Sequence, residues 1–346
     1  MAELLKKENT SSFAEFRQSP VTKRWVLVNP GRARRPEEFD QSKKRRQGKA
    51  SKESCPFCHG NEAKFTPKSL LELYMPGQKE WAVRVVPNKY PAVLEEEVDL
   101  EPSLIDTYHK RKAATGTHEV LITGDHDKYT AKMPVPLVDK MLETYQLRIQ
   151  ELSRNKHIEY VIIFQNQGDE AGASVVHPHS QLISMNHVPS HPLGEIKNSK
   201  VYFKKHKRCL ICDILKLERD LQKRVVMESD NFIVYMPYAA RFPFKVWLLP
   251  KDHHSMFESL EPALRRELAE VLKEYLSILD KKLGEPAYNY YLHTLPVNGA
   301  YSDEQDSYHW HFSIFPRINI LAGFEFGAGI AINEMPPEMA CEFLKK

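Results

Sequence analysis

The sequence predicts an α+β fold built from a duplicated unit of strands and helices. Three features occur twice and in the same order: a Cys-x-x-Cys pair, a strand that ends in Asp-His, and a strand that contains His-x-His. An ordered recurrence of this kind indicates an internal duplication. We therefore expect two units, at residues 1–190 and 191–346.

The bulk composition is that of an ordinary globular protein. The 346 residues are 42% hydrophobic and 27% charged, with a net charge of +3 that is too small for this length to favour nucleic-acid binding. No apolar stretch is long enough to span a bilayer, and residues 1–10 lack the apolar region of a signal peptide. We expect a cytoplasmic protein that binds neither nucleic acid nor membrane.

The first unit has an apolar run at residues 81–86 and a second strand at residues 120–122, which leads to the Asp-His pair ending at His126. Apolar residues at helical spacing then predict a helix over roughly residues 136–155. A strand at residues 160–164 leads into the first His-x-His segment.

The second unit repeats this order. Its strands are expected at residues 232–236 and 246–249, and the second of them leads to the Asp-His pair ending at His253. An amphipathic pattern over residues 262–283 predicts a helix, and a strand at residues 288–292 precedes the second His-x-His segment.

Two stretches fall outside the repeated pattern. Residues 186–208, between the units, are rich in Pro, His and Lys, and we expect a connector there. The tail that begins at residue 316 is rich in glycine.

The cysteines predict two metal sites. Four of the five form Cys-x-x-Cys pairs, which in a reducing compartment more often bind metal than form disulfides. Two thiolates with two imidazoles favour tetrahedral zinc, and four protein ligands leave no open position, so we expect structural ions. The expected ligand sets are Cys55, Cys58, His126 and His177, and Cys209, Cys212, His253 and His309. In the second set His311 is an alternative ligand.

The other interpretation of these residues is that the cysteines are small core side chains and the histidines are scattered polar ones. Two Cys-x-x-Cys pairs among only five cysteines weigh against it.

The segment 176–181 places His177, His179 and Gln181 at alternating positions of a strand, and residues two apart share one face. If His177 faces a metal, His179 has no structural role left. A neutral imidazole attacks phosphorus well near pH 7 and leaves readily from the resulting phosphoramidate. This pattern suits a group transfer in two steps through a covalent intermediate.

The segment from Asn166 to Ser174, which precedes this row, fits a phosphate-binding loop. Gly168 and Gly172 allow a close approach of the backbone. Asn166, Ser174 and Gln181 offer neutral donors to phosphoryl oxygens. Because the second His-x-His segment has no such loop, we place the chemistry in the first unit and treat the second as its structural copy.

Three arginines lie in the turn-rich segment 29–36. The planar guanidinium matches phosphate geometry, which suggests a role at a phosphate. A solvated basic turn is an equally good interpretation on composition alone.

Taken together, these motifs resemble those of the galactose-1-phosphate uridylyltransferases, a family of the histidine-triad superfamily. The similar segments occur in order over nearly the whole chain, and His-Pro-His-x-Gln with its lead-in is highly specific. They are residues 28–36, 55–58, 88–92, 166–181, 242–244, 250–253 and 323–325. The resemblance implies a duplicated antiparallel fold of two histidine-triad-like halves, nucleotidyl transfer by a ping-pong mechanism, and a homodimer whose active sites use both subunits.

The resemblance also implies roles for single residues. His179 would be the nucleophile that carries the nucleotide, and Gln181 would hold the phosphoryl group. Zinc at the first ligand set matches the family as well. The residues implied at the substrate are Asn166, Gly172 and Ser174 at the α-phosphate, Arg32, Arg35, Asn88 and Lys89 at the nucleotide, and Glu325 at the hexose.

The leading expectation for the reaction is transfer of UMP between UDP-glucose and galactose 1-phosphate. Two departures resemble a branch of the family that includes ADP-glucose phosphorylase: the presence of a second Cys-x-x-Cys, and the lack of glutamine in residues 327–333. Adenylyl transfer by an ADP-glucose phosphorylase is therefore the nearest alternative. A non-catalytic, zinc-containing nucleotide-binding protein is the third, and the intact His179 and Gln181 argue against it.

Overall fold

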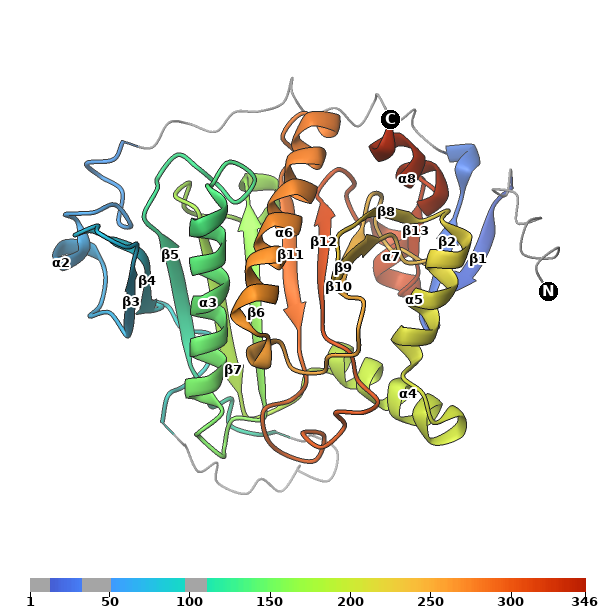
Figure 1. Ribbon diagram of the computed structural model, residues 1–346, viewed down its shortest axis with the longest axis horizontal. Coiled ribbons are helices and arrows are strands. Elements are labelled where there is room, and N and C mark those ends of the chain that lie inside the picture. The colour runs from blue at the N-terminus through green and yellow to red at the C-terminus, as the bar shows by residue number, and fades with distance from the viewer. Residues whose placement is uncertain (1–12, 33–50, 97–110) are drawn as a thin grey trace.

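The computed structural model describes residues 13–32, 51–96 and 111–346. In this part of the chain a ten-stranded antiparallel sheet forms the body of the protein, and a three-stranded sheet lies beside one end of it (Figure 1). Two long helices, α3 (Val135–Leu152) and α6 (Pro262–Leu283), pack side by side across one face of the large sheet (Figure 1). The predicted α+β class is confirmed.

The order of the strands displays the duplication. It runs β3-β4-β5-β7-β6-β11-β12-β10-β9-β8, so that each strand of the first half has a counterpart at the matching position of the second. The first half supplies β3 (Leu71–Tyr74), β4 (Trp81–Pro87), β5 (His118–Thr123), β6 (Tyr160–Gln167) and β7 (His179–Met185). The second half supplies β8 (Val225–Glu228), β9 (Phe232–Tyr235), β10 (Val246–Pro250), β11 (Tyr288–His293) and β12 (His311–Pro316). The halves meet where β6 pairs with β11, with Gln167 opposite Tyr288. The division at residue 190 stays a prediction.

The two long helices follow their sequence signals. A proline lies in the first turn of each, where its missing N–H costs no hydrogen bond, and Gly284 ends α6 in the left-handed conformation. The apolar stripe that predicted α3 faces the sheet, and all its members are buried: Leu137, Met141, Tyr145, Ile149 and Leu152. One hydrophobic core extends through both halves.

The stretch expected to be a connector is instead helical. Residues Ser190–His206 form α4, and α5 (Leu210–Leu221) follows it. The buried positions of α4 are Pro192, Glu195, Ile196 and Ser199, which recur at helical spacing. Because only Ile196 among them is an ordinary core residue, hydrophobic periodicity gave no signal. The helix ends at Lys207, which adopts φ 55°.

The N-terminal and C-terminal segments pack together on the second half. Strands β1 (Glu15–Gln18), β2 (Trp25–Val28) and β13 (Ala331–Asn333) form the small sheet, flanked by α7 (Gly323–Ala328) and α8 (Pro337–Lys345) (Figure 1). Glu338 of α8 accepts hydrogen bonds from Arg17 at 2.9 Å and from Arg224 at 2.7 Å, and both arginines are buried. This ion-pair network fixes the glycine-rich tail to the second half.

Shorter helical segments complete the architecture. They are η1 (Pro30–Arg32), α2 (Glu62–Phe65), η3 (Asp169–Ala171) and η4 (Phe257–Ser259). Among the residues described, no helix combines the length and apolar character that a membrane crossing requires.

A close approach between β5 and β7 yields the first prediction. A Cβ on Gly116 would lie 1.9 Å from the carbonyl oxygen of Ser184, which is backbone and cannot move aside. We expect Gly116→Ala to lower the free energy of unfolding by about 2–4 kcal/mol in urea denaturation. The control is Gly194→Ala within α4, where a Cβ meets nothing within 4 Å and alanine should add about 0.5–1 kcal/mol. An unchanged unfolding midpoint for Gly116→Ala would contradict the packing of these strands.

Candidate active site and metal centres

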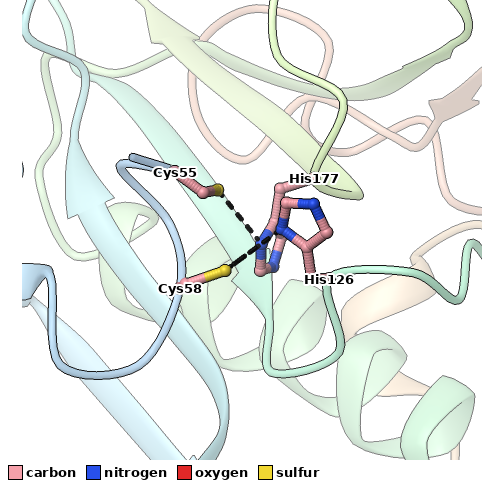
Figure 2. A group of neighbouring side chains, drawn as sticks. All are labelled: Cys55, Cys58, His126 and His177. Carbon is pink, nitrogen blue, oxygen red and sulfur yellow. Dashed lines mark hydrogen bonds between the residues drawn. The ribbon is translucent and has the colours of Figure 1, made fainter. Parts of the chain in front are cut away.

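The first Cys/His group brings together four buried side chains from distant parts of the first half (Figure 2). Cys55 and Cys58 lie in the loop before α2, His126 follows β5, and His177 precedes β7. The sulfur of Cys58 is 3.1 Å from Nδ1 of His126, and both cysteine sulfurs are 3.6 Å from Nδ1 of His177 (Figure 2). All four ligand atoms lie within 4.8 Å of one another, so the group could hold one metal ion.

The protonation of this group fits a metal site. Nε2–H of His177 donates to the carbonyl of Thr123 at 2.6 Å, which directs the Nδ1 lone pair toward the sulfurs. Burial lowers the pKa of His177 to about 4, so the ring is neutral. Burial and the adjacent Cys55 raise the pKa of the Cys58 thiol to about 12, so a cation is needed to hold the pair as thiolates.

The second Cys/His group repeats this arrangement in the second half. The sulfur of Cys212 lies 3.5 Å from Nδ1 of His253 and 3.6 Å from Nδ1 of His309, and Cys209 completes the group. The opposite ring nitrogens donate to backbone carbonyls, from His253 to Gln305 at 2.9 Å and from His309 to Pro250 at 3.1 Å. This group is more open to solvent than the first, because His253 is exposed and Cys212 only half-buried.

A third group was missed by the sequence analysis. Glu195, His293 and His311 are buried together, and Nδ1 of His293 lies 2.9 Å from Oε2 of Glu195. Two imidazoles and a carboxylate could also hold a metal ion. His311 therefore belongs with this group and is not a ligand in the second Cys/His set, as one interpretation of the sequence had it. The sequence did not indicate Glu195 as a site residue, because it lies in the segment expected to be a connector. Its helical spacing from Pro192 and Ser199 was the one pattern that could have indicated a buried position.

His179 begins β7 and is buried beside the first Cys/His group. Its Nδ1–H donates to the carbonyl of His177 at 2.9 Å, so Nε2 carries the free lone pair. Burial lowers the pKa of His179, which keeps the imidazole neutral at pH 7. The ring of Phe57 packs edge-on against it, with 5.2 Å between centroids. A fixed neutral imidazole with one free lone pair has the properties of a nucleophile.

Gln181 lies two residues further along β7. Its Oε1 is 2.8 Å from Nε2 of His118 on β5, and the side chain of Asn88, just after β4, lies 3.1 Å from the same ring nitrogen. The side chains of the predicted residues Asn88 and Gln181 thus lie beside the same ring nitrogen of His118, across three neighbouring strands. His118 carries no motif of its own.

The expected phosphate loop forms a tight turn between β6 and β7. Gly168 and Gly172 both have φ +87°, a conformation that favours glycine, and η3 lies between them. The side-chain carbonyl of Asn166 is held by Asn289 of β11. Nδ2 of Asn289 donates to Oδ1 of Asn166 at 2.8 Å and to the backbone carbonyl of Ala171 at 2.9 Å. The amide nitrogen of Asn166 is thereby turned toward Gly172.

The other predicted substrate residues are spread more widely. Ser174 is exposed in the loop, Lys89 is exposed after β4, and Arg32 ends η1. Arg35 lies outside the described residues. Helix α7, which carries Glu325, lies beside the small sheet (Figure 1), and Oε2 of Glu325 accepts the backbone N–H of Ala322 at 2.9 Å. Within one chain α7 thus lies with the second half, whereas His179 belongs to the first half.

Comparison with protein families agrees with this geometry. The family model for the N-terminal domain of galactose-1-phosphate uridyl transferase matches residues 4–189, and that for its C-terminal domain matches residues 195–326. The chain belongs to the galactose-1-phosphate uridylyltransferase family. Members of this family are nucleotidyltransferases and phosphorylases.

Individual relatives cover nearly the whole chain. ADP-glucose phosphorylase of Arabidopsis thaliana is 33% identical over 96% of this chain and 92% of its own length. Galactose-1-phosphate uridylyltransferase of Thermotoga maritima is 27% identical over 96% and 98%. Among solved structures, an ADP-glucose phosphorylase of Arabidopsis thaliana with bound ADP-glucose has a TM-score of 0.80 at 31% identity, covering 96% of this chain and 98% of that one. A uridylyltransferase structure has a TM-score of 0.72 at 28% identity, covering 96% and 97%.

The two Cys/His groups yield the second prediction. Since each group supplies a closed set of four ligands, we expect Cys58→Ala and Cys212→Ala each to lose about one bound metal ion per chain, measured by elemental analysis of the purified protein. Cys341→Ala is the matched control, because this buried thiol donates to the carbonyl of Val225 and belongs to neither group. Metal content unchanged by Cys58→Ala would refute the first site.

Proposed function

We propose that this family member transfers a nucleotidyl group from a nucleotide sugar to a phosphate acceptor, with His179 as the covalent carrier. The observation that carries the proposal is the state of His179: it is neutral, its Nδ1–H is engaged by the carbonyl of His177, and its Nε2 lone pair is free. Gln181 and the glycine-bearing loop that begins at Asn166 lie on either side of it in the fold.

The reaction balances in two transfers. In the first, Nε2 of His179 attacks the α-phosphorus, a P–N bond forms, and the bond to the bridging oxygen breaks with release of the sugar 1-phosphate. In the second, a phosphate oxygen of the acceptor attacks the same phosphorus, the P–N bond breaks, and neutral His179 is restored. A sugar phosphate leaves as an anion without a proton from the enzyme, so an amide suffices at Gln181, where an acid would be needed for a poorer leaving group.

The amides act on the charge of the phosphoryl group. Asn166 and Gln181 each carry an NH2 group that can donate to a non-bridging oxygen, and the loop at Gly168 and Gly172 allows backbone N–H groups to approach. Arg32, Arg35, Asn88, Lys89 and Ser174 are proposed to bind the rest of the nucleotide.

Two nucleotide sugars are candidates for the donor. Adenylyl transfer from ADP-glucose is supported by the comparisons. The relative and the structure named ADP-glucose phosphorylase are more similar to this chain, in identity and TM-score, than the two uridylyltransferases described above. Uridylyl transfer between UDP-glucose and galactose 1-phosphate, the leading expectation from the sequence, is the second candidate. It is favoured by the family models and by the curated relatives that bear this name.

We propose zinc as the metal of both Cys/His groups. Two thiolates and two imidazoles suit its tetrahedral preference, and a closed set of four ligands gives a structural role. In the first group, Cys55 and Cys58 would hold their loop against His177 and so fix the start of β7. No disulfide joins any of the described cysteines, which supports a reducing, cytoplasmic setting.

We propose a homodimer in which α7 of the partner completes the hexose end of the site. Within one chain, α7, which carries Glu325, lies beside the small sheet and the strands of the second half, whereas β7 belongs to the first half (Figure 1). Large apolar side chains are exposed in or next to α7 in the sequence and on the small sheet, including Ile320 at 92%, Phe326 at 75% and Trp25 at 49%. An exposed apolar surface of this kind is typical of a protein contact.

The transfer chemistry is tested by trapping the intermediate, which is the third prediction. UDP-glucose and ADP-glucose, each labelled in the α-phosphate, are incubated with the protein, and the denatured protein is assayed for acid-labile label. We expect label on the wild type from the true donor and none on His179→Ala, because the P–N bond forms at that ring. The nucleotide that labels the protein identifies the base. Label that persists on His179→Ala would refute the mechanism.

The dimer is tested by complementation, the fourth prediction. His179→Ala and Glu325→Ala are co-expressed with different tags, and the mixed dimer is purified through both. If each site combines His179 of one subunit with Glu325 of the other, one of its two sites is intact, and we expect about half the wild-type rate. If both residues act within one chain, the mixed dimer has no intact site and should be as inactive as its parents.

A further inference from the structure

We propose that His118 is a positioning residue that orients the amide of Gln181, so that the NH2 group and not the carbonyl faces the phosphoryl group. The inference rests on the proposed function and adds a residue to it. A phosphoryl oxygen only accepts hydrogen bonds, whereas an amide has a donor end and an acceptor end of nearly the same shape. Something must therefore decide which end of Gln181 meets the substrate.

The tautomer of His118 follows from its surroundings. The backbone N–H of Ala92 donates to Nδ1 of His118 at 3.1 Å, so Nδ1 bears no proton. The ring proton is then on Nε2. Of the two groups beside Nε2, the amide nitrogen of Asn88 cannot accept a hydrogen bond, and Oε1 of Gln181, at 2.8 Å, can. Nε2–H of His118 thus donates to the carbonyl of Gln181.

The strands hold this contact rigidly. Val120 of β5 lies opposite Gln181 of β7, so His118, two residues earlier, is a diagonal neighbour on the same face. His118 is buried, and the chain just before it is fixed to β7 by the bond from the N–H of Thr117 to the hydroxyl of Ser184. With its carbonyl occupied, Gln181 can present only its NH2 group elsewhere.

The other amide of the proposed site is held in the same way. The carbonyl of Asn166 accepts from Nδ2 of Asn289, which leaves the NH2 group of Asn166 toward Gly172. In both amides, the side-chain carbonyl oxygen therefore accepts a hydrogen bond from a neighbouring strand. Among the described residues, neither NH2 group donates to a protein acceptor.

The test measures the rate of nucleotidyl-enzyme formation in single turnovers, with the labelled donor that modifies the wild type. His118→Leu removes the N–H, and we expect a roughly ten- to hundredfold slower step with little change in substrate affinity. His118→Gln, whose amide can reach the place of Nε2, should recover most of the rate, whereas the shorter His118→Asn should not. His187→Leu makes the same change at an exposed histidine and should match the wild type.

A double-mutant cycle separates positioning from a structural role. If His118 acts through Gln181, His118→Leu should slow the Gln181→Ala protein no further. Equal fold-losses in both backgrounds, or a wild-type rate for His118→Leu, would overturn the inference. If His118→Leu fails to fold, the comparison of His118→Gln with His118→Asn decides it, and equal rates for these two would overturn it. An unlabelled wild type would instead overturn the proposed function and this inference with it.

Discussion

The three side chains of the predicted row, His177, His179 and Gln181, are each held by a different partner, although only His179 and Gln181 lie in strand β7. His177 is fixed between the carbonyl of Thr123 and the cysteine pair. His179 is fixed by the carbonyl of His177, and Gln181 by the strand beside it. A displacement of His177 would therefore move His179 directly, so the candidate metal group and the proposed nucleophile are coupled through one short segment.

In the second half, the position that corresponds to His179 has different surroundings. His311 occupies the place that His179 has in the first half, yet it is 1% exposed and stacks on Trp247 with 4.1 Å between ring centroids. Among the described residues neither of its ring nitrogens has a hydrogen-bond partner, and Glu195 and His293 surround it. Because these side chains enclose the ring, we assign this duplicated position to structure or a buried ion, and the proposed group transfer to His179.

The fold could be predicted from the sequence wherever a pattern of residues has a single structural interpretation. Apolar periodicity located α3 and α6, and the repeated order of motifs anticipated the matching halves of the sheet. Apolar periodicity failed for α4, because the buried face of that helix contains Glu195, whose hydrogen-bond partner His293 lies far away in the chain. His118 could not be found for a similar reason: a single histidine in a strand gains its meaning only from the register that sets it beside Gln181.

The pairing of β6 with β11 brings a residue of the second half into the proposed site. The sequence had suggested that this half is only a structural copy. Asn289 lies opposite Asn166 in this pairing and takes up its carbonyl, so the donor end of Asn166 is set by a residue of the other half. The continuous sheet thus does more than join two cores. It places one anchoring donor on each side of β7 and β6, His118 on β5 and Asn289 on β11, so both halves contribute to the orientation of the two amides in the proposed site.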